Sequence, residues 1–190
     1  MARFLWCVAL TLLILTAASP AGAAPPNSFG GAGTYRVGRD FQPGVYRATG
    51  ATACYWHRAR NASGRPASIL ANDIGSGQRI VYIRPSDRVF RTSGCSRWRR
   101  IFDSGLQRVS TRTTLPGDGV YLVGADFVPG TYRTVGNTSA CYWQRSSSAD
   151  GAIDTIITNG IAKGAPTVTV DASDAIFSTS RCNPWVRVGP

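Results

Sequence analysis

The sequence predicts an all-β protein with two tandem homologous modules, each a small antiparallel β-sandwich or barrel that holds one disulfide. Three observations predict this fold. One phrase is written twice, because residues 33–50 and 119–136 match at an offset of 86 residues with 11 of 18 pairs identical. Turn-forming residues are frequent, with 21 Gly and 11 Pro, and no segment has the periodicity of an amphipathic helix. Four of the five cysteines recur in step with the repeat.

The first segment has the features of a secretory signal peptide, which we predict for residues 1–23. An apolar run extends from Phe4 to Leu15, and Ala21-Gly22-Ala23 offers a cleavage site of small residues. The run is shorter than the about 20 residues that cross a bilayer, so we predict no transmembrane span. Residues 24–32 are expected to form a flexible N-terminal segment.

The first, Arg-rich β-module is predicted for residues 33–103, a linker for residues 104–118, and the second β-module for residues 119–190. Short runs of Val, Tyr and Thr bounded by Gly or Pro are typical of strands. The pairs Pro43-Gly44 and Pro129-Gly130 are expected to form type II turns, because Pro presets the first corner and Gly tolerates the positive φ of the second. Whether the two modules share a sheet does not follow from the sequence.

The cysteines after the signal segment predict two disulfides, because an even number in an exported chain is typical of a disulfide framework. Spacing alone allows three pairings. Each repeat has one cysteine in its middle and one near its end, and a duplicated unit should keep its own bridge. We therefore predict Cys54–Cys95 and Cys141–Cys182. The chain has one histidine and no C-x-x-C motif, so we predict neither a metal site nor a cofactor.

The repeated tetrapeptide Ala-Cys-Tyr-Trp places its Cys and Trp on one face of a strand and its Tyr on the other. Trp56 and Trp143 are expected to pack in the core near the disulfides, and a surface platform for sugars or other flat ligands is the alternative. The candidate surface aromatic contacts are Tyr55, Trp98 and Tyr142.

The two modules differ in charge although their patterns agree. Residues 33–103 hold 13 Arg and four Asp, a net charge of +9, whereas residues 119–190 hold four Arg, one Lys and five Asp, a net charge of zero. Such a positive field favours polyanions, and the arginine fork suits phosphate and carboxylate. A merely solvated face is the alternative. The candidate anion-binding residues are Arg58, Arg60, Arg84, Arg88, Arg91, Arg97, Arg99 and Arg100.

The sequence does not predict an enzyme. It contains no Glu, and it lacks a G-x-S-x-G elbow, a metal-binding His pair and a phosphate-binding loop. Asp40 and Asp126 precede the repeated turn, where a carboxylate commonly caps backbone N–H groups. A hydrolase that uses these two residues with His57 is the catalytic alternative.

The phrases VGRDFQPGVYR, CYWHR and SDRVFRTSGC begin at Val37, Cys54 and Ser86. As a set they resemble a small all-β domain found in exported proteins and lipoproteins of actinobacteria, mycobacteria among them, and the resemblance covers nearly all of both modules. It implies a location and a fold rather than a mechanism, because that family has no established activity or ligand. The second module departs from the first at Arg181, where the first has Gly94.

These observations together predict an exported, noncatalytic protein that is secreted or associated with the cell envelope. The expected partner is an anionic cell-envelope polymer or a lipid headgroup, contacted by the first module. Nucleic acid is a less favoured partner, because the chain is exported and has no nucleic-acid-binding motif. The alternative is a secreted protein–protein interaction module, such as an inhibitor or a host-directed factor, that binds through strand edges or exposed Tyr and Trp.

Overall fold

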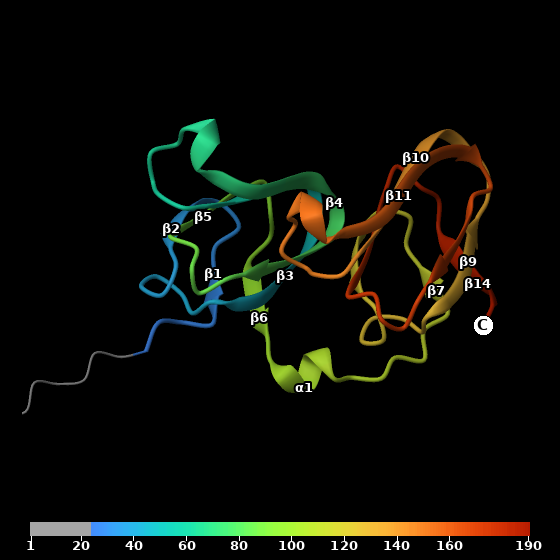
Figure 1. The fold of residues 1–190 in the computed structure, drawn as a ribbon, viewed down its shortest axis with the longest axis horizontal. Coiled ribbons are helices and arrows are strands. Elements are labelled where there is room, and N and C mark those ends of the chain that lie inside the picture. The colour runs from blue at the N-terminus through green and yellow to red at the C-terminus, as the bar shows by residue number, and fades with distance from the viewer. Residues whose placement is uncertain (1–23) are drawn as a thin grey trace, which may run out of the picture.

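The structure is a computed structural model that describes residues 24–190, so the predicted signal peptide lies outside the described residues. Module 1 (residues 27–102) and module 2 (residues 113–190) lie side by side along the long axis of the molecule (Figure 1). Nearly all regular elements are strands, which confirms the predicted all-β fold. Within residues 24–190 there is no helix long and apolar enough to cross a membrane.

Module 1 is built around the long antiparallel hairpin of β3 and β4. β5 pairs with the second half of β3 and β6 with the first half, so β3 connects both groups of strands. The short strands β1 and β2 then pair with β6 and β5. The elements are β1 (Ser28–Phe29), β2 (Gly33–Arg36), β3 (Gly44–Ala59), the 3-10 turn η1 (Pro66–Ser68), β4 (Ile69–Ile83), β5 (Val89–Ser93) and β6 (Trp98–Ile101).

Module 2 repeats this arrangement, but each long strand is divided. β9 and β10 correspond to β3, and β11 and β12 correspond to β4. Pro166 interrupts the second pair where module 1 has Arg79, because proline has no N–H to donate to a neighbouring strand. The elements are β7 (Thr114–Leu115), β8 (Gly119–Leu122), β9 (Gly130–Thr134), β10 (Asn137–Ser146), the 3-10 turn η2 (Ile153–Thr155), β11 (Ile156–Gly164), β12 (Thr167–Val170), β13 (Ile176–Ser180) and β14 (Trp185–Gly189).

The two modules share a sheet at one point, where Gln78 of β4 and Gly119 of β8 form a parallel bridge. Beside this bridge Ile80 of module 1 packs with Val120, Leu122, Ala125 and Ile176 of module 2 in a buried cluster separate from the two module cores. Leu106, from the short connecting helix α1 (Asp103–Leu106), packs against the same cluster. The modules are therefore joined by an apolar core of their own.

The repeated phrase D-F-x-P-G-x-Y builds the same turn in both modules. Phe41 is fully buried, and the Tyr46 hydroxyl donates to the Gln42 carbonyl at 2.6 Å. Burial raises the pKa of Tyr46 to about 12, so the hydroxyl remains a donor. The Asp40 carboxylate accepts from the Arg36 backbone N–H at 2.8 Å, as expected of a turn cap. Module 2 repeats these contacts with Phe127, Tyr132 and Asp126.

The predicted type II turns at the two Pro-Gly pairs are wrong. Gly44 and Gly130 are the first residues of β3 and β9, with φ of +148° and +143° rather than the about +80° of a type II corner. The chain reverses earlier, around Gly38 and Gly124, which have φ of +80° and +78°. Each Pro-Gly pair therefore lies at the start of a strand.

The predicted disulfides are confirmed: Cys54 is bonded to Cys95, and Cys141 to Cys182. Trp56 is buried in the core of module 1, as expected, whereas Trp143 is only partly buried against the core of module 2. The bridges thus tie the middle of each repeat to its end, beside the pairing of β3 with β5 and of β10 with β13.

Each module begins earlier than the sequence predicts. Phe29 falls in the predicted flexible segment 24–32, yet it is 4% exposed and packs in the core of module 1. Leu115 falls in the predicted linker 104–118, yet it is 1% exposed and packs in the core of module 2. The two residues occupy equivalent positions of the repeat, so both predicted segments are wrong at their C-terminal ends.

We predict that replacing Cys54 and Cys95 together by Ser lowers the free energy of unfolding by about 4 kcal/mol. The closed loop spans a sequence separation of 41 residues, and opening it returns that entropy to the unfolded chain. Urea unfolding followed by tryptophan fluorescence measures the change. A loss below about 1 kcal/mol would show that packing alone holds the module.

Candidate functional site

Asp150 of module 2 is inserted between two arginines of module 1. Its carboxylate pairs with Arg84 and lies 3.7 Å from Nη1 of Arg58, whose Nη1 also donates to the Asp150 carbonyl at 2.5 Å. Arg58 in addition forms a bidentate pair with Asp87, at 2.8 and 3.2 Å. The side chains of Arg58, Asp87 and Asp150 are no more than 3% exposed, so each depends on the others to offset the cost of leaving water. We call these four residues the interface ion cluster.

Module 2 contains an equivalent arginine, and both carboxylates that pair with it belong to module 2. Arg145 stands where module 1 has Arg58, and it pairs with Asp174 at 2.6 Å and with Asp171. Asp171 occupies the position of Arg84 in the repeat. The hydrogen bond to Asp174 raises the pKa of Arg145 above its ordinary value. Module 2 therefore supplies both carboxylates itself, whereas module 1 takes its second carboxylate from module 2.

Five exposed arginines lie on β2 and β5 or on the segments beside them, and Figure 1 shows these two strands at the end of module 1 that lies away from module 2. The strand register places Arg36 of β2 opposite Val89 of β5, two residues from Arg91. The backbone N–H of Arg88 donates to the carbonyl of Ala59, next to Arg60, at 3.0 Å. This distal arginine cluster consists of Arg36, Arg39, Arg60, Arg88 and Arg91.

Only one member of the distal arginine cluster has a carboxylate partner among the described residues. Arg39 lies 3.6 Å from Asp40, in a pair whose arginine is 70% exposed. The remaining four guanidinium groups have no ion pair within residues 24–190. They are available to an external anion.

The repeat explains why this face is basic in one module and not in the other. The positions equivalent to the distal arginine cluster are Leu122, Ala125, Ser147, Ala175 and Ser178 in module 2. Leu122, Ala125 and Ala175 belong to the apolar cluster that joins the modules. The face that module 2 buries against module 1 is thus the face that module 1 leaves free, and a terminal repeat needs a polar outer face.

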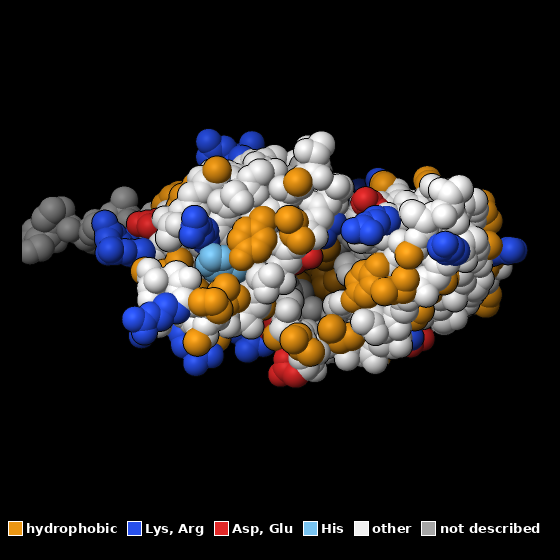
Figure 2. All heavy atoms as spheres, turned by 90° about the horizontal axis from the view of Figure 1, so that it is seen from above, with side chains coloured by type: hydrophobic (Ala, Val, Ile, Leu, Met, Phe, Trp, Pro, Cys, Tyr) orange, Lys and Arg blue, Asp and Glu red, His pale blue; other side chains and the backbone are white. Residues whose placement is uncertain are grey.

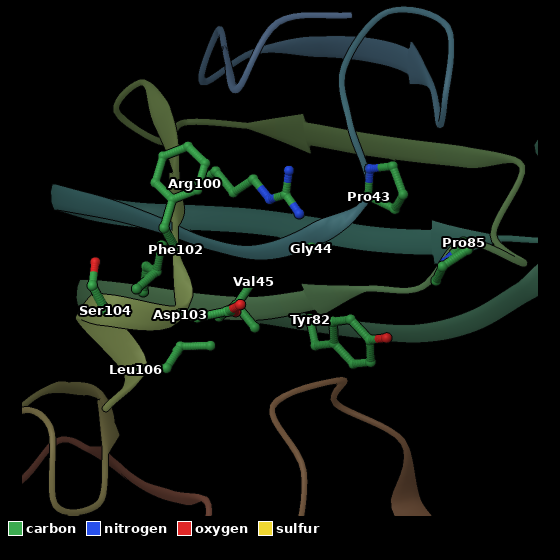
Figure 3. A pocket seen from close by; sticks show the side chains of 11 residues that line it. Pro43, Gly44, Val45, Tyr82, Pro85, Arg100, Phe102, Asp103, Ser104 and Leu106 are labelled. Atoms are coloured by element: carbon green, nitrogen blue, oxygen red, sulfur yellow. The ribbon is translucent and has the colours of Figure 1, made fainter. Parts of the chain in front are cut away.

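A second group of arginines lies at β6 and includes Arg97, Arg99 and Arg100. Arg97 and Arg99 are exposed, whereas Arg100 is half-buried and donates to Asn27 Oδ1 at 3.2 Å. The guanidinium of Arg100 lies over the ring of Phe102, 5.5 Å from its centroid, at a hollow of about 700 Å³ (Figure 3). Arg100 is therefore held by contacts within the protein.

The structure divides the eight predicted anion-binding arginines among three places. Three join the distal arginine cluster, three lie at β6, and two are taken by the interface ion cluster. Arg58 is buried and paired, so its predicted place in an anion-binding surface is wrong. Arg84 is 46% exposed, but its guanidinium is paired with Asp150.

The three predicted aromatic contacts differ in burial. Trp98 is fully buried and its indole N–H donates to Thr92, so its prediction as a surface contact is wrong. Tyr55 and Tyr142 are half-buried at equivalent positions. The Tyr55 hydroxyl lies 3.0 Å from Nδ1 of His57, and that of Tyr142 donates to Gln144 at 2.6 Å.

Sequence reasoning missed Arg36 and Arg39 in the basic surface. The signal was present, because these residues align with Leu122 and Ala125 of the second repeat. An exchange of an apolar residue for arginine at matched positions marks a face that is buried in one copy and exposed in the other.

His57 lies beside the distal arginine cluster. It stands opposite Arg91 in the pairing of β3 with β5. Burial, and then the positive charge of Arg91, lower the pKa of His57 below its ordinary value. Figure 2 shows the histidine among hydrophobic and basic side chains on module 1. No group of three or more His, Cys, Asp or Glu within residues 24–190 is arranged to hold a metal ion.

A family model, described as the Rv1352-like extracellular domain, matches the chain twice, over residues 27–99 and 113–186. The chain belongs to this family. The two matches of the Rv1352-like extracellular domain begin just before β1 and β7, in agreement with the module boundaries of the structure. Membership confirms the predicted resemblance and the extracellular location.

Two mycobacterial relatives carry a similar domain. They are the uncharacterized protein Rv1352 of Mycobacterium tuberculosis and the uncharacterized protein Mb1387 of Mycobacterium bovis. Each is 33% identical over 94 residues, which cover 43% of this chain and 76% of the relative. No solved structure matches the chain.

We predict that Asp150→Ala lowers the free energy of unfolding by about 2–4 kcal/mol, because it leaves buried Arg58 with one carboxylate instead of two. Urea unfolding measures the loss. The matched control is Asp171→Ala, which removes the equivalent partner of Arg145 at a 54% exposed position and should cost less than about 1 kcal/mol. Equal losses in the two variants would contradict a special role for the interface ion cluster.

We predict that the free energy of unfolding falls as pH drops below about 6.5, the ordinary pKa of histidine. The pKa of His57 is lowered in the folded protein, so the unfolded chain binds the proton more readily and acid favours unfolding. His57→Gln, which copies Gln144 of module 2, should remove this dependence. Urea unfolding at pH 7.5, 6.5 and 5.5 compares the two proteins, and parallel pH dependences would refute the assignment.

Proposed function

We propose that the protein is an exported, noncatalytic binding protein whose module 1 attaches to an anionic polymer or anionic lipid headgroups of the cell envelope. The distal arginine cluster supports this proposal most directly. It presents four exposed guanidinium groups without an ion-pair partner in the described chain, on or beside β2 and β5.

Solubility alone does not account for this face. A surface that only has to remain in water usually mixes charges of both signs. The distal arginine cluster has one sign, and within residues 24–190 its only carboxylate neighbour in an ion pair is Asp40. A concentrated field of one sign raises the local concentration of polyanions, and the planar guanidinium binds phosphate or carboxylate oxygens in pairs.

The residues of the catalytic alternative, Asp40, Asp126 and His57, have structural contacts, which favours binding over chemistry. The carboxylates of Asp40 and Asp126 both accept backbone N–H groups in the repeated turn. His57 has the Tyr55 hydroxyl as its hydrogen-bond partner. Arg97 and Arg99 at β6 extend the exposed positive charge of module 1 beyond the distal arginine cluster.

Module 2 contributes to this function through the fold. It completes the interface ion cluster and covers Ile80 of module 1 with apolar side chains. An isolated module 1 would expose both surfaces, so binding has to be measured on the whole protein.

We predict that the oxidised protein binds long-chain inorganic polyphosphate with an affinity that falls steeply as salt rises. The variant Arg36→Ser/Arg88→Ser/Arg91→Ser should bind about tenfold more weakly or worse. Its slope of log affinity against log salt should be smaller by about one for each arginine that contacts phosphate. Fluorescence titration between 50 and 300 mM NaCl provides both quantities.

The matched control is Arg133→Ser/Lys163→Ser, which removes two exposed charges from module 2 and should leave the salt slope unchanged. Vesicles of phosphatidylglycerol, compared with phosphatidylcholine, separate a lipid headgroup from a polymer as the source of phosphate. Equal weakening by the two variants, or an affinity that does not respond to salt, would rule out the proposed role of the distal arginine cluster.

A further inference from the structure

Three cavities join into one groove between the modules, and they follow β4. The first, of about 510 Å³, is lined by β4 residues from Ile69 to Asn72. The second, of about 270 Å³, shares Asn72 and continues to Asp73, and the third, of about 370 Å³, shares Asp73 and continues to Ile74. Module 2 forms the opposite wall, and Figure 2 shows the hollow between the two halves of the molecule.

The edge of β4 that lines this groove has no partner strand over most of its length. One edge of β4 pairs with β3 from end to end. The other edge meets β8 only at Gln78, so within the described chain the stretch Ile69–Ser76 is an open edge. Open edges offer unpaired N–H and C=O groups to an added strand. Module 2 already uses this edge further along, where the Tyr82 N–H donates to the Ala149 carbonyl at 2.8 Å.

Two buried donors beside the groove lack acceptors. Trp56 lines the middle cavity and Arg79 lines the third, and both side chains are almost fully buried. Trp56 Nε1 and Arg79 Nε are two of only three buried side-chain nitrogen or oxygen atoms without a hydrogen-bond partner in residues 24–190. Buried polar groups are normally paired, so the groove favours a ligand that supplies acceptor oxygens.

The rim of the groove is apolar and exposed. Ile74 of β4 is 65% exposed, and Ile161 of β11 and Ile153 of η2 on the module 2 side are 70% and 87% exposed. Exposed isoleucines on both walls of a cleft favour a ligand with apolar side chains. An extended peptide combines such side chains with carbonyl acceptors.

Arg181 adds a charge to one end of the groove. It lines the third cavity, is exposed, and has no ion pair among the described residues. Its φ is +56°, and it is the only residue other than glycine with positive φ in residues 24–190. Module 1 has Gly94 at this position, with φ of +68°. An arginine held in a conformation that glycine adopts freely is a strained residue of the kind that gathers at binding sites.

We infer that the groove binds an extended acidic peptide segment of another protein, which adds a strand to β4 and places a carboxylate at Arg181. The peptide carbonyls supply acceptors along the edge, and its apolar side chains contact Ile74 and Ile161. Asp73 does not repel the acidic group, because it is already paired with Arg79 at 3.0 Å. This site is separate from the distal arginine cluster, and either can fail without the other.

A random decapeptide phage library, selected on the oxidised variant Arg36→Ser/Arg88→Ser/Arg91→Ser in 0.15 M NaCl, tests the inference. This variant lacks three arginines of the distal arginine cluster and keeps Arg181, whose contact with a carboxylate high salt would screen. Selected peptides should alternate apolar residues and carry Asp or Glu. Synthetic copies should bind at least tenfold more weakly to Ile74→Lys and to Arg181→Gly. Methylating alternate backbone nitrogens of the peptide, which removes N–H groups needed for strand pairing, should abolish binding.

The variants are chosen to fold. Ile74 is exposed, and Arg181→Gly restores the residue of module 1, so neither should lower the midpoint of urea unfolding. Arg91→Ser, in the distal arginine cluster, is the control and should leave peptide affinity unchanged. The inference is overturned if no peptide is enriched over the double variant Ile74→Lys/Arg181→Gly. It is also overturned if selected peptides lose affinity for Arg91→Ser but not for Arg181→Gly.

Discussion

The buried pairing of Arg58 with Asp87 and Asp150 is the constraint on which the arrangement of the modules depends. A guanidinium that is 3% exposed is stable only where carboxylates surround it, and one of its two carboxylates comes from the other module. The same junction contains a second polar link, because Asp126 caps its own turn and also accepts from Arg47 and Gln78 of module 1. The ion pairs specify how the two modules are oriented, and apolar burial around Ile80 stabilises that arrangement further.

Duplication has given one face of the repeat two different uses. In module 2 the face is apolar at Leu122, Ala125 and Ala175 and is buried at the junction. In module 1 the matched positions are Arg36, Arg39 and Arg88, and all three are exposed. The charge difference between the modules therefore follows from their positions in the chain. Module 2 packs this face against module 1, whereas module 1 exposes it to water or to an anion. Module 1 could not dock through this face on a further copy in the way that module 2 docks on module 1.

The sequence predicted what the repeat preserves. The repeat, at an offset of 86 and then 87 residues, identified both disulfides, the all-β class and the Asp cap of the shared turn, because those features use the same residues in each copy. The repeat could not predict that Arg58 is buried. Its partner residues, Asp87 and Asp150, lie 29 and 92 residues away in the sequence, and only the fold brings them to Arg58. The edge strands at Phe29 and Leu115 were missed because each is two residues long and the core residue differs. The groove along β4 arises from the packing of the modules, which neither repeat encodes by itself.

The position of Asp150 also sets an order in time. A ribosome makes Arg58 and Arg84 well before it makes Asp150, and N-terminal units ordinarily begin to fold first. The early half of this chain can therefore collapse around its aromatic core and close its disulfide, but it acquires its last buried counter-charge only when the late half arrives. Module 2, with Asp171 beside Arg145, has no such delay. Module 1 is therefore synthesised first, but its buried ion pairs are completed last.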